Sequence, residues 1–161
     1  MAWLRELNVE LSALDVFITH LHADHSGLAG EFVDYGAKIF MSRQDAELLS
    51  NGIRWDMMAQ YARSNGFPPE ESVQAITRHP AYRFGLPGGK VKFTHLGEGD
   101  SLEYGDYRFR CVLTPGHTLA HICLFEPSKR LLLSGDHILD HITPNISYWT
   151  DTRNSLQEYM E

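Results

Sequence analysis

The segment from Thr19 to Gly27 reads THLHADHSG, and it constrains this chain more than any other stretch. It follows the apolar run VFI, which predicts a short buried strand. Side chains alternate along an extended chain, so His20 and His22 would point to the same side and could share one metal ion. Asp24 and His25 come as the backbone turns, and they could face a second metal. Imidazoles and carboxylates suit zinc, and also iron or manganese.

Two later stretches carry the same kinds of side chain in predicted turns. TPGHT places His117 after a predicted strand that ends near Leu113, and SGDH places Asp136 after the apolar run LLL. The Pro-Gly and Ser-Gly pairs permit tight turns that aim the next side chain outward. Either residue alone would usually be structural. Together with the HxHxDH pattern they form an ordered set of possible metal ligands.

THLHADHSG, TPGHT and SGDH, in this order, resemble the motifs of the metallo-β-lactamase superfamily, over about residues 14–140. The resemblance implies an α/β fold, the four-layer αβ/βα sandwich, with a metal site along one edge between two sheets. It also implies two divalent metal ions, with zinc as the first expectation and iron or manganese as alternatives. In the implied ligand set, the first metal is held by His20, His22 and His117, the second by Asp24 and His25, and Asp136 bridges both.

The aspartate at position 136 bears on the activity that the resemblance implies. The β-lactamases of the superfamily usually carry cysteine or serine at this position. An aspartate there resembles the binuclear hydrolases of the superfamily, such as hydroxyacylglutathione hydrolases, lactonases and tRNA 3′-processing endonucleases. The implied mechanism uses metal-activated water, and Asp24 would orient the hydroxide as the catalytic residue. We therefore expect a metal-dependent hydrolase of a small ester, thioester or lactone.

Composition bears on the expected partners and on the alternatives. The 14 basic and 21 acidic residues give a net charge of −7, which argues against binding to a nucleic-acid backbone. A tRNA-processing type of phosphodiesterase is therefore the alternative enzyme, and a non-catalytic module stabilised by metal is the other alternative. A small-molecule substrate is the expected partner. No membrane contact is expected, because no apolar run approaches the ~20 residues of a membrane span. Cys111 and Cys123 have no CxxC spacing, which favours a reduced, cytoplasmic setting.

The resemblance also predicts how the chain is organised. Residues 1–161 would form a single metallo-β-lactamase-like domain that is incomplete at both ends, with a helical insert at about residues 43–79. The superfamily normally supplies a further histidine ligand from its C-terminal half. Only His137 and His141 follow Asp136, and both lie too close to it to match, so the second metal site is expected to lack one ligand. Open sheet edges would favour self-association.

Hydrophobic spacing predicts the order of helices and strands. Leucines spaced by three or four predict a helix over residues 4–14, and Ser26 and Gly36 would begin and end the next helix. Helices divided near Pro69 are predicted over residues 43–79. Strands are predicted at residues 16–19, 38–42, 91–96, 107–114, 121–125 and 130–135, with a final helix at 154–161.

Several remaining side chains admit two interpretations. The block that holds Trp55, Met57, Met58 and Tyr61 is interpreted as packing rather than as a substrate lid. The later run with Asn145, Ser147, Tyr148 and Trp149 could line a substrate pocket, although a folded loop is the preferred interpretation. His121 could support a metal ligand by hydrogen bonding, or it could be a buried structural histidine. His79 and His95 are interpreted as structural.

Overall fold

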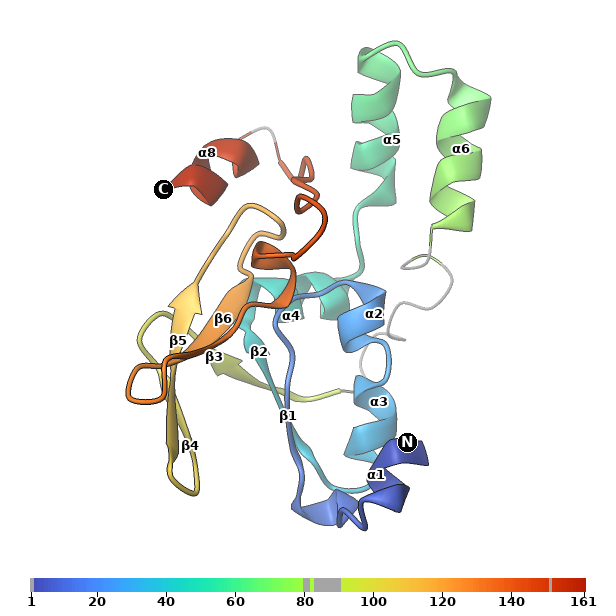
Figure 1. Cartoon of the computed structure of the whole chain (residues 1–161). Helices are drawn as coiled ribbons and strands as arrows, with labels where there is room; N and C mark the ends of the chain where they lie inside the picture. The colour runs from blue at the N-terminus through green and yellow to red at the C-terminus, as the bar shows by residue number, and fades with distance from the viewer. Residues whose placement is uncertain (1, 80–81, 83–90, 151) are drawn as a thin grey trace.

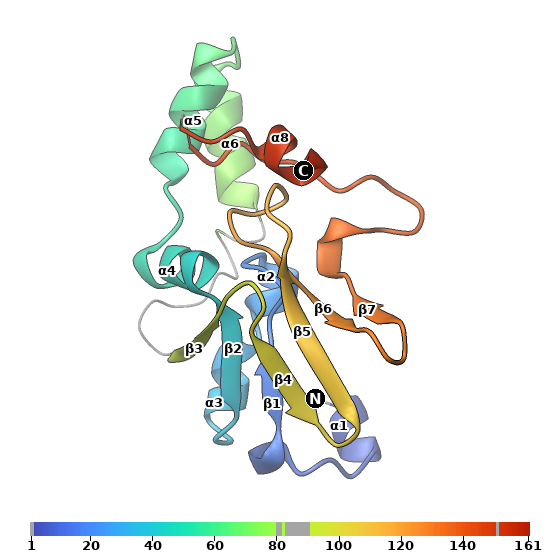
Figure 2. The ribbon, with the colours of Figure 1, turned by 90° about the vertical axis from the view of Figure 1, so that its left-hand side faces the viewer.

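Two β-sheets lie in the middle of the molecule, and helices flank them (Figure 1). The computed structural model describes residues 2–79, 82, 91–150 and 152–161. The first sheet is parallel, in the order β1-β2-β3, and the second is an antiparallel meander, in the order β4-β5-β6-β7 (Figure 2). The strands are β1 (Asp15–Phe17), β2 (Lys38–Ser42), β3 (Phe93–Leu96), β4 (Ser101–Tyr104), β5 (Tyr107–Leu113), β6 (Ile122–Glu126) and β7 (Leu131–Leu133).

Most of the helices come before the second sheet in the chain. The α-helices are α1 (Ala2–Glu6), α2 (Ala23–Ser26), α3 (Ala29–Val33), α4 (Arg43–Asn51), α5 (Trp55–Ser64), α6 (Pro69–Arg78) and α8 (Ser155–Met160). Two 3₁₀ turns are η1 (Leu11–Ala13) and η2 (Gly135–His137). Helices α5 and α6 form a hairpin that projects from the body of the molecule, beyond α2 and α4 (Figure 1).

Alternation along β2 divides the apolar core between two faces of the first sheet. Ile39 and Met41 are buried against residues of α3 and α4, including Ala46. Phe40 packs on the other face, against a cluster that includes Leu124 of the second sheet. The first sheet is therefore covered by helices on one side and by the second sheet on the other. This arrangement is an incomplete αβ/βα sandwich, so the predicted fold class is confirmed.

The predicted strands and helices after residue 37 largely match the structure. The strand predicted at 38–42 is β2, with identical bounds, and the helical block at 43–79 consists of α4, α5 and α6. Ser42 begins α4 by accepting a hydrogen bond from the backbone N–H of Asp45. Pro69 stands at the first turn of α6, as predicted. The strand β4, which directly precedes the turn into β5, was not predicted.

Two predicted helices near the N-terminus were wrong in their bounds. Helix α1 ends at Glu6, and Asn8 adopts a φ of 52°, so the leucine spacing does not continue one helix to residue 14. Leu7 is 72% exposed, and without an apolar partner its spacing alone does not hold a helix. Ser26 does not begin a helix but is the last residue of α2, where its hydroxyl donates to the backbone oxygen of Leu21.

The strand β7 forms one edge of the second sheet among the residues that the structure describes. Its three leucines, Leu131, Leu132 and Leu133, are 42%, 45% and 50% exposed. An apolar edge of this kind can pair with another strand. Within the described part of the chain, no helix is long and apolar enough to cross a bilayer.

Candidate metal centre

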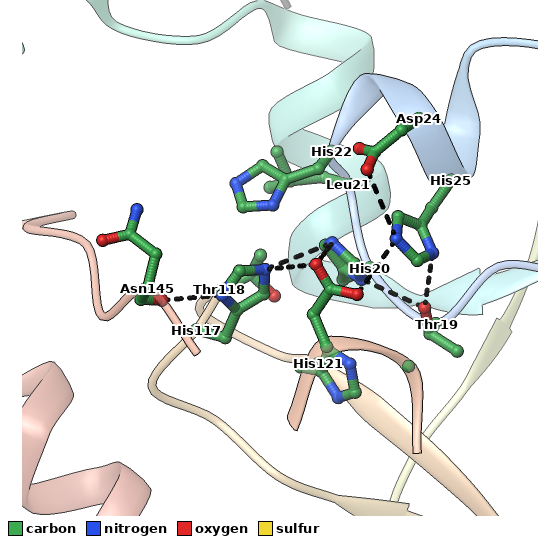
Figure 3. Close-up of polar contacts among 12 residues, drawn as sticks. Thr19, His20, Leu21, His22, Asp24, His25, His117, Thr118, His121 and Asn145 are labelled. Atoms are coloured by element: carbon green, nitrogen blue, oxygen red, sulfur yellow. Dashed lines mark hydrogen bonds and ion pairs between the residues drawn. The ribbon is translucent and has the colours of Figure 1, made fainter. Parts of the chain in front are cut away.

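The side chains predicted as metal ligands converge at one end of the two sheets. His20, His22, Asp24 and His25 come from the segment after β1 and from α2, His117 from the loop between β5 and β6, and Asp136 from η2 after β7. The backbone N–H of Ile122 donates to the carbonyl oxygen of Thr19 over 2.9 Å, which joins the first of these segments to β6. Segments almost a hundred residues apart therefore meet at one site (Figure 3).

His20, His22 and His117 form the first group of possible ligands, called here the inner group. One ring nitrogen from each lies within 4.8 Å of the others. The Nε2 atoms of His20 and His117 are 3.3 Å apart, and both side chains are almost completely buried. His20 and His22 do share one side, as predicted, but the segment between them is a bend that follows β1 and not a continuation of the strand.

Asp24 and His25 form the outer group, and Asp136 lies between the two groups. Oδ1 of Asp136 is 3.2 Å from Nε2 of His25, and its Oδ2 is 3.6 Å from Nε2 of His117. Asp24 is the most exposed of these residues, at 76% of its side chain, and its Oδ2 lies 3.6 Å from Nε2 of His25. One carboxylate facing both groups is the arrangement expected of a bridging ligand between two metal ions.

Two glycines explain why the second and third motifs contain Pro-Gly and Ser-Gly. Gly116 has a φ of 122°, and a Cβ there would lie 2.5 Å from Cβ of Tyr159. Gly135 has a φ of 49°, and a Cβ there would lie 2.6 Å from Nε2 of His121. Any other residue would clash at both positions, and each glycine directly precedes a residue of the centre. Steric hindrance therefore requires glycine at the position before His117 and at the position before Asp136.

Hydrogen bonds to the protein hold several imidazoles in a fixed orientation. Nδ1 of His117 lies 2.6 Å from the backbone oxygen of Asn145, which can only accept, so Nδ1 carries the proton and Nε2 keeps its lone pair. The hydroxyl of Thr19 lies 3.0 Å from Nδ1 of His20 and 3.4 Å from Nδ1 of His25. These contacts direct the Nε2 atoms of all three rings toward the centre (Figure 3).

Burial and mutual repulsion keep three of the clustered histidines neutral. Burial, with repulsion from the neighbouring imidazoles, holds the pKa of His20 far below its usual range. The same causes lower the pKa of His22 to about 4 and that of His121 to about 3. A neutral imidazole has a free lone pair, which is what metal coordination requires. The donor set therefore fits divalent metal ions without a cost for removing protons from these rings at neutral pH.

A buried carboxylate that sequence reasoning missed joins the two segments of the inner group. Asp45 is fully buried, and it accepts hydrogen bonds from the backbone of Leu21 (3.1 Å), the hydroxyl of Thr118 (2.7 Å) and the backbone of Ala120 (3.1 Å). Leu21 stands between His20 and His22, and Thr118 follows His117. Burial raises the pKa of Asp45 to about 6, although these three hydrogen bonds lower it. An Asp near the start of α4 carries no sequence signal beyond helix capping.

The other histidines take places that the sequence only partly anticipated. His121 stacks on His20 at 5.1 Å between ring centroids, and its Nδ1 lies 2.8 Å from the hydroxyl of Thr114, so it lies directly behind the inner group. His141 is 90% exposed and pairs with Asp140 at 2.9 Å, away from the centre. Among the described residues, the side chains close enough to share an ion form two sets, His20–His22–His117 and His20–His25–Asp136, and Asp24 belongs to neither.

The centre opens onto a cavity of about 700 Å³ that extends to α5 and α6. His22 and Asp24 line one end of this cavity. Trp55 and Met58 line it from α5, and Trp149 lines it from the loop before α8. The interpretation of Trp55 and Met58 as packing residues was therefore incomplete, and so was the preference for a simple folded loop at Asn145, Ser147 and Trp149, which also line the cavity.

Comparison with known proteins identifies the family. A family model described as the metallo-beta-lactamase superfamily matches residues 14–161. This chain belongs to that superfamily. The resemblance stated from the three motifs is confirmed, and the incomplete sandwich is a portion of the superfamily fold.

Relatives and solved structures place the chain within the superfamily. A metallo-beta-lactamase family protein from Thermus thermophilus has a TM-score of 0.78 and 26% identity, over 99% of this chain and 52% of that one. An acyl-coenzyme A thioesterase of Homo sapiens is 25% identical over 76% of this chain and 40% of its own length. A hydroxyacylglutathione hydrolase of Ectopseudomonas mendocina is 28% identical, over 84% and 37%. The chain spans about half or less of the length of these proteins.

Proposed function

We propose that this chain carries the metal centre of a hydrolase that acts on a small thioester, ester or lactone. The single observation that carries this proposal is the position of Asp136, whose two oxygens face the inner and outer groups separately. A centre that only stabilises the fold has no need of two adjacent groups that open onto a cavity. Zinc is the first expectation, with iron or manganese as alternatives.

The residues of the centre would have different roles in the proposed reaction. Divalent ions bound here would polarise the substrate oxygen and lower the pKa of a bound water molecule. His20, His22 and His117 would hold the first ion, His25 and Asp24 the second, and Asp136 both. Asp24, at the end of the cavity, would also orient the attacking oxygen and accept its hydrogen bond. Thr19 and the backbone of Asn145 would keep the imidazoles in place.

The names of two relatives favour a thioester within this substrate class. An acyl-coenzyme A thioesterase and a hydroxyacylglutathione hydrolase both act on thioesters by name, and both resemble this chain over more than three quarters of its length. The net charge of −7 weighs against the phosphodiesterase alternative.

We also propose that the exposed edge of β7 pairs with a second copy of the chain. Sedimentation of the wild type and of Leu132→Lys would test this pairing.

The test of the proposed function combines metal content with a substrate panel. The chain is loaded with zinc, manganese or iron, its metal content is measured by plasma mass spectrometry, and it is assayed with a thioester, an aryl ester, a lactone and bis-p-nitrophenyl phosphate. We expect about two ions per chain and turnover of the first three substrates. Turnover of the phosphodiester alone would favour the nuclease alternative. Bound metal that raises the melting temperature without any turnover would favour a non-catalytic module.

A further inference from the structure

The cavity beside the metal centre has two chemically different ends. Polar side chains gather at the end near the centre, where His22, Asp24 and Asn145 line it. The far end is lined by α5, α6 and the turn between them. Apart from Glu71, Ser72 and His79, every side chain that this hairpin contributes to the lining is apolar. A molecule that fills the whole cavity would therefore have a polar end at the metal and an apolar arm against α5 and α6.

The hairpin leaves room for such an arm because its facing residues are small. Ala59 and Ala62 line the cavity from α5, and Ala75 lines it from α6. The larger apolar residues Met58 and Ile76 stand beside them on the same helices. Helices α5 and α6 contact each other, and their small side chains leave open the face of the hairpin that borders the cavity, whose whole volume is about 700 Å³. This volume is in the range of sites that bury most of a small ligand.

The hairpin is also attached to the loop that closes the other side of the cavity. The rings of Tyr61 on α5 and Tyr148 stack in parallel, with their centroids 3.8 Å apart and an interplanar angle of 5°. Trp149, the next residue, lines the cavity and donates from its indole nitrogen to the backbone oxygen of His117. One continuous set of contacts therefore links α5, the cavity wall and a residue of the inner group.

From this arrangement we propose that the part of the cavity lined by α5 and α6 binds the apolar acyl chain of the substrate. This inference rests on the proposed function, because it assumes that the scissile carbonyl lies at the metal centre. The substrate class is then an ester or thioester of a fatty acid. Hydrolysis adds water across the acyl bond, releases the alcohol or thiol, and leaves the fatty acid with its carboxylate at the centre.

The first test is a chain-length series with the metal-loaded protein. Acetyl, butyryl, hexanoyl and octanoyl esters of p-nitrophenol share one leaving group, so differences in kcat/KM report the acyl arm alone. We expect kcat/KM to rise about fourfold for each methylene group that enters the cavity. A flat series with metal-dependent turnover of the acetyl ester would overturn the acyl pocket and leave the proposed function standing.

A matched pair of substitutions on α6 makes the test specific to the cavity. Ala75→Phe would place a ring in the cavity, and we expect it to lower the ratio of octanoyl to acetyl turnover at least tenfold. Val73, on the same helix, is 54% exposed and is not among the lining residues, so Val73→Phe should leave that ratio unchanged. Equal effects of the two substitutions would contradict the proposal.

A binding measurement separates failure of the pocket from failure of the proposed function. Trp55 and Trp149 both line the cavity, so octanoate that enters it should change tryptophan fluorescence. If no ester is hydrolysed but octanoate binds the wild type and binds Ala75→Phe at least tenfold more weakly, the pocket is supported and the hydrolase proposal fails. Absence of octanoate binding to the metal-loaded wild type would overturn the acyl pocket.

Discussion

The inner and outer groups of the metal centre lie within a few ångströms of each other, yet they are built differently. In the inner group, His20 and His117 are almost fully buried, and their Nδ1 atoms have protein partners. In the outer group, His25 is 29% exposed at its side chain and Asp24 is 76% exposed. One short segment, residues 20–25, therefore supplies a buried ligand at its start and two solvent-facing ones at its end. We expect the inner group to retain metal and the outer group to provide the chemistry.

The largest expected effect is on catalysis and concerns Asp24. Replacement by alanine removes the group that orients the attacking oxygen, so we expect kcat/KM to fall about 10²- to 10⁴-fold. Because the Asp24 side chain is mostly exposed, the melting temperature should change little. Steady-state kinetics on a p-nitrophenyl ester measures the first effect, and thermal unfolding measures the second.

The matched control for Asp24 is Asp140, another exposed aspartate, which pairs with His141 away from the centre. Asp140→Ala should retain wild-type kcat/KM. If Asp24→Ala retains it as well, the outer group has no catalytic role and the division of work between the two groups is wrong.

The second prediction compares metal affinity at the two groups. Titration of the metal-free chain should show two steps, with the outer ion bound about 10- to 100-fold more weakly because Asp24 and His25 are more exposed to solvent than His20 and His117. His25→Ala should remove the weaker step alone, whereas His117→Ala should weaken the tighter step. Calorimetry with zinc measures both.

His141 provides the control for this comparison, because it is 90% exposed and lies outside the centre. His141→Ala should reproduce both steps of the wild type. A single tight step that His25→Ala and His117→Ala abolish equally would mean that the two groups act as one site.

The sequence predicted the members of the centre better than it predicted how they are held. Five of the residues that its motifs predicted lie in the two sets of possible ligands: His20, His22, His25, His117 and Asp136. Asp24 belongs to neither set and contacts the centre through His25. The same reasoning missed Asp45, because its three hydrogen-bond partners lie 24, 73 and 75 residues away. Contacts that depend on tertiary structure leave no periodic signal in the sequence.

A similar limit explains the errors in the fold. The bounds of β2 were predicted correctly because its side chains point alternately to two buried faces. One face packs on the helices and the other on the second sheet. The leucine pattern at the N-terminus has a helical period, but Leu7 finds no surface to pack against, and the helix ends before it. Periodicity predicts an element only where tertiary packing supports it.

The third prediction concerns Asp45, which holds the inner group from behind. Asp45→Ala would leave buried donors of Leu21, Thr118 and Ala120 without a partner, at about 1–3 kcal/mol for each unpaired donor. We expect a large loss of stability and at least a tenfold loss of affinity at the inner group. Urea unfolding and zinc calorimetry measure these effects.

Asp45→Asn separates the loss of stability from the loss of ligand orientation. An asparagine oxygen in the place of Oδ2 can still accept from the backbone of Leu21 and from the hydroxyl of Thr118, whereas the backbone N–H of Ala120 would lose its acceptor. This variant should therefore fold and show an intermediate affinity for zinc. If Asp45→Asn binds zinc as tightly as the wild type, the contact with Ala120 does not help to orient the inner group.

The smallest expected effect is the pH dependence of the metal-free chain. The pKa of His20, His22 and His121 is lowered in the folded state, so between about pH 4 and 6.5 the unfolded chain binds more protons and stability falls as the pH falls. Asp45 acts in the opposite direction, because its raised pKa of about 6 makes the folded state bind the extra proton. The three histidines together change the free energy of unfolding more than the one carboxyl does. We therefore expect the chain to be about 1–2 kcal/mol less stable at pH 6 than at pH 7.

Urea unfolding in the presence of a chelator measures this pH dependence, and a pair of substitutions sharpens it. His121→Gln removes a buried imidazole behind the inner group, so it should reduce the slope of stability against pH. Val73→Gln, at an exposed position of α6, removes no titrating group and should leave the slope unchanged. If both variants keep the wild-type slope, the buried histidines do not cause the pH dependence.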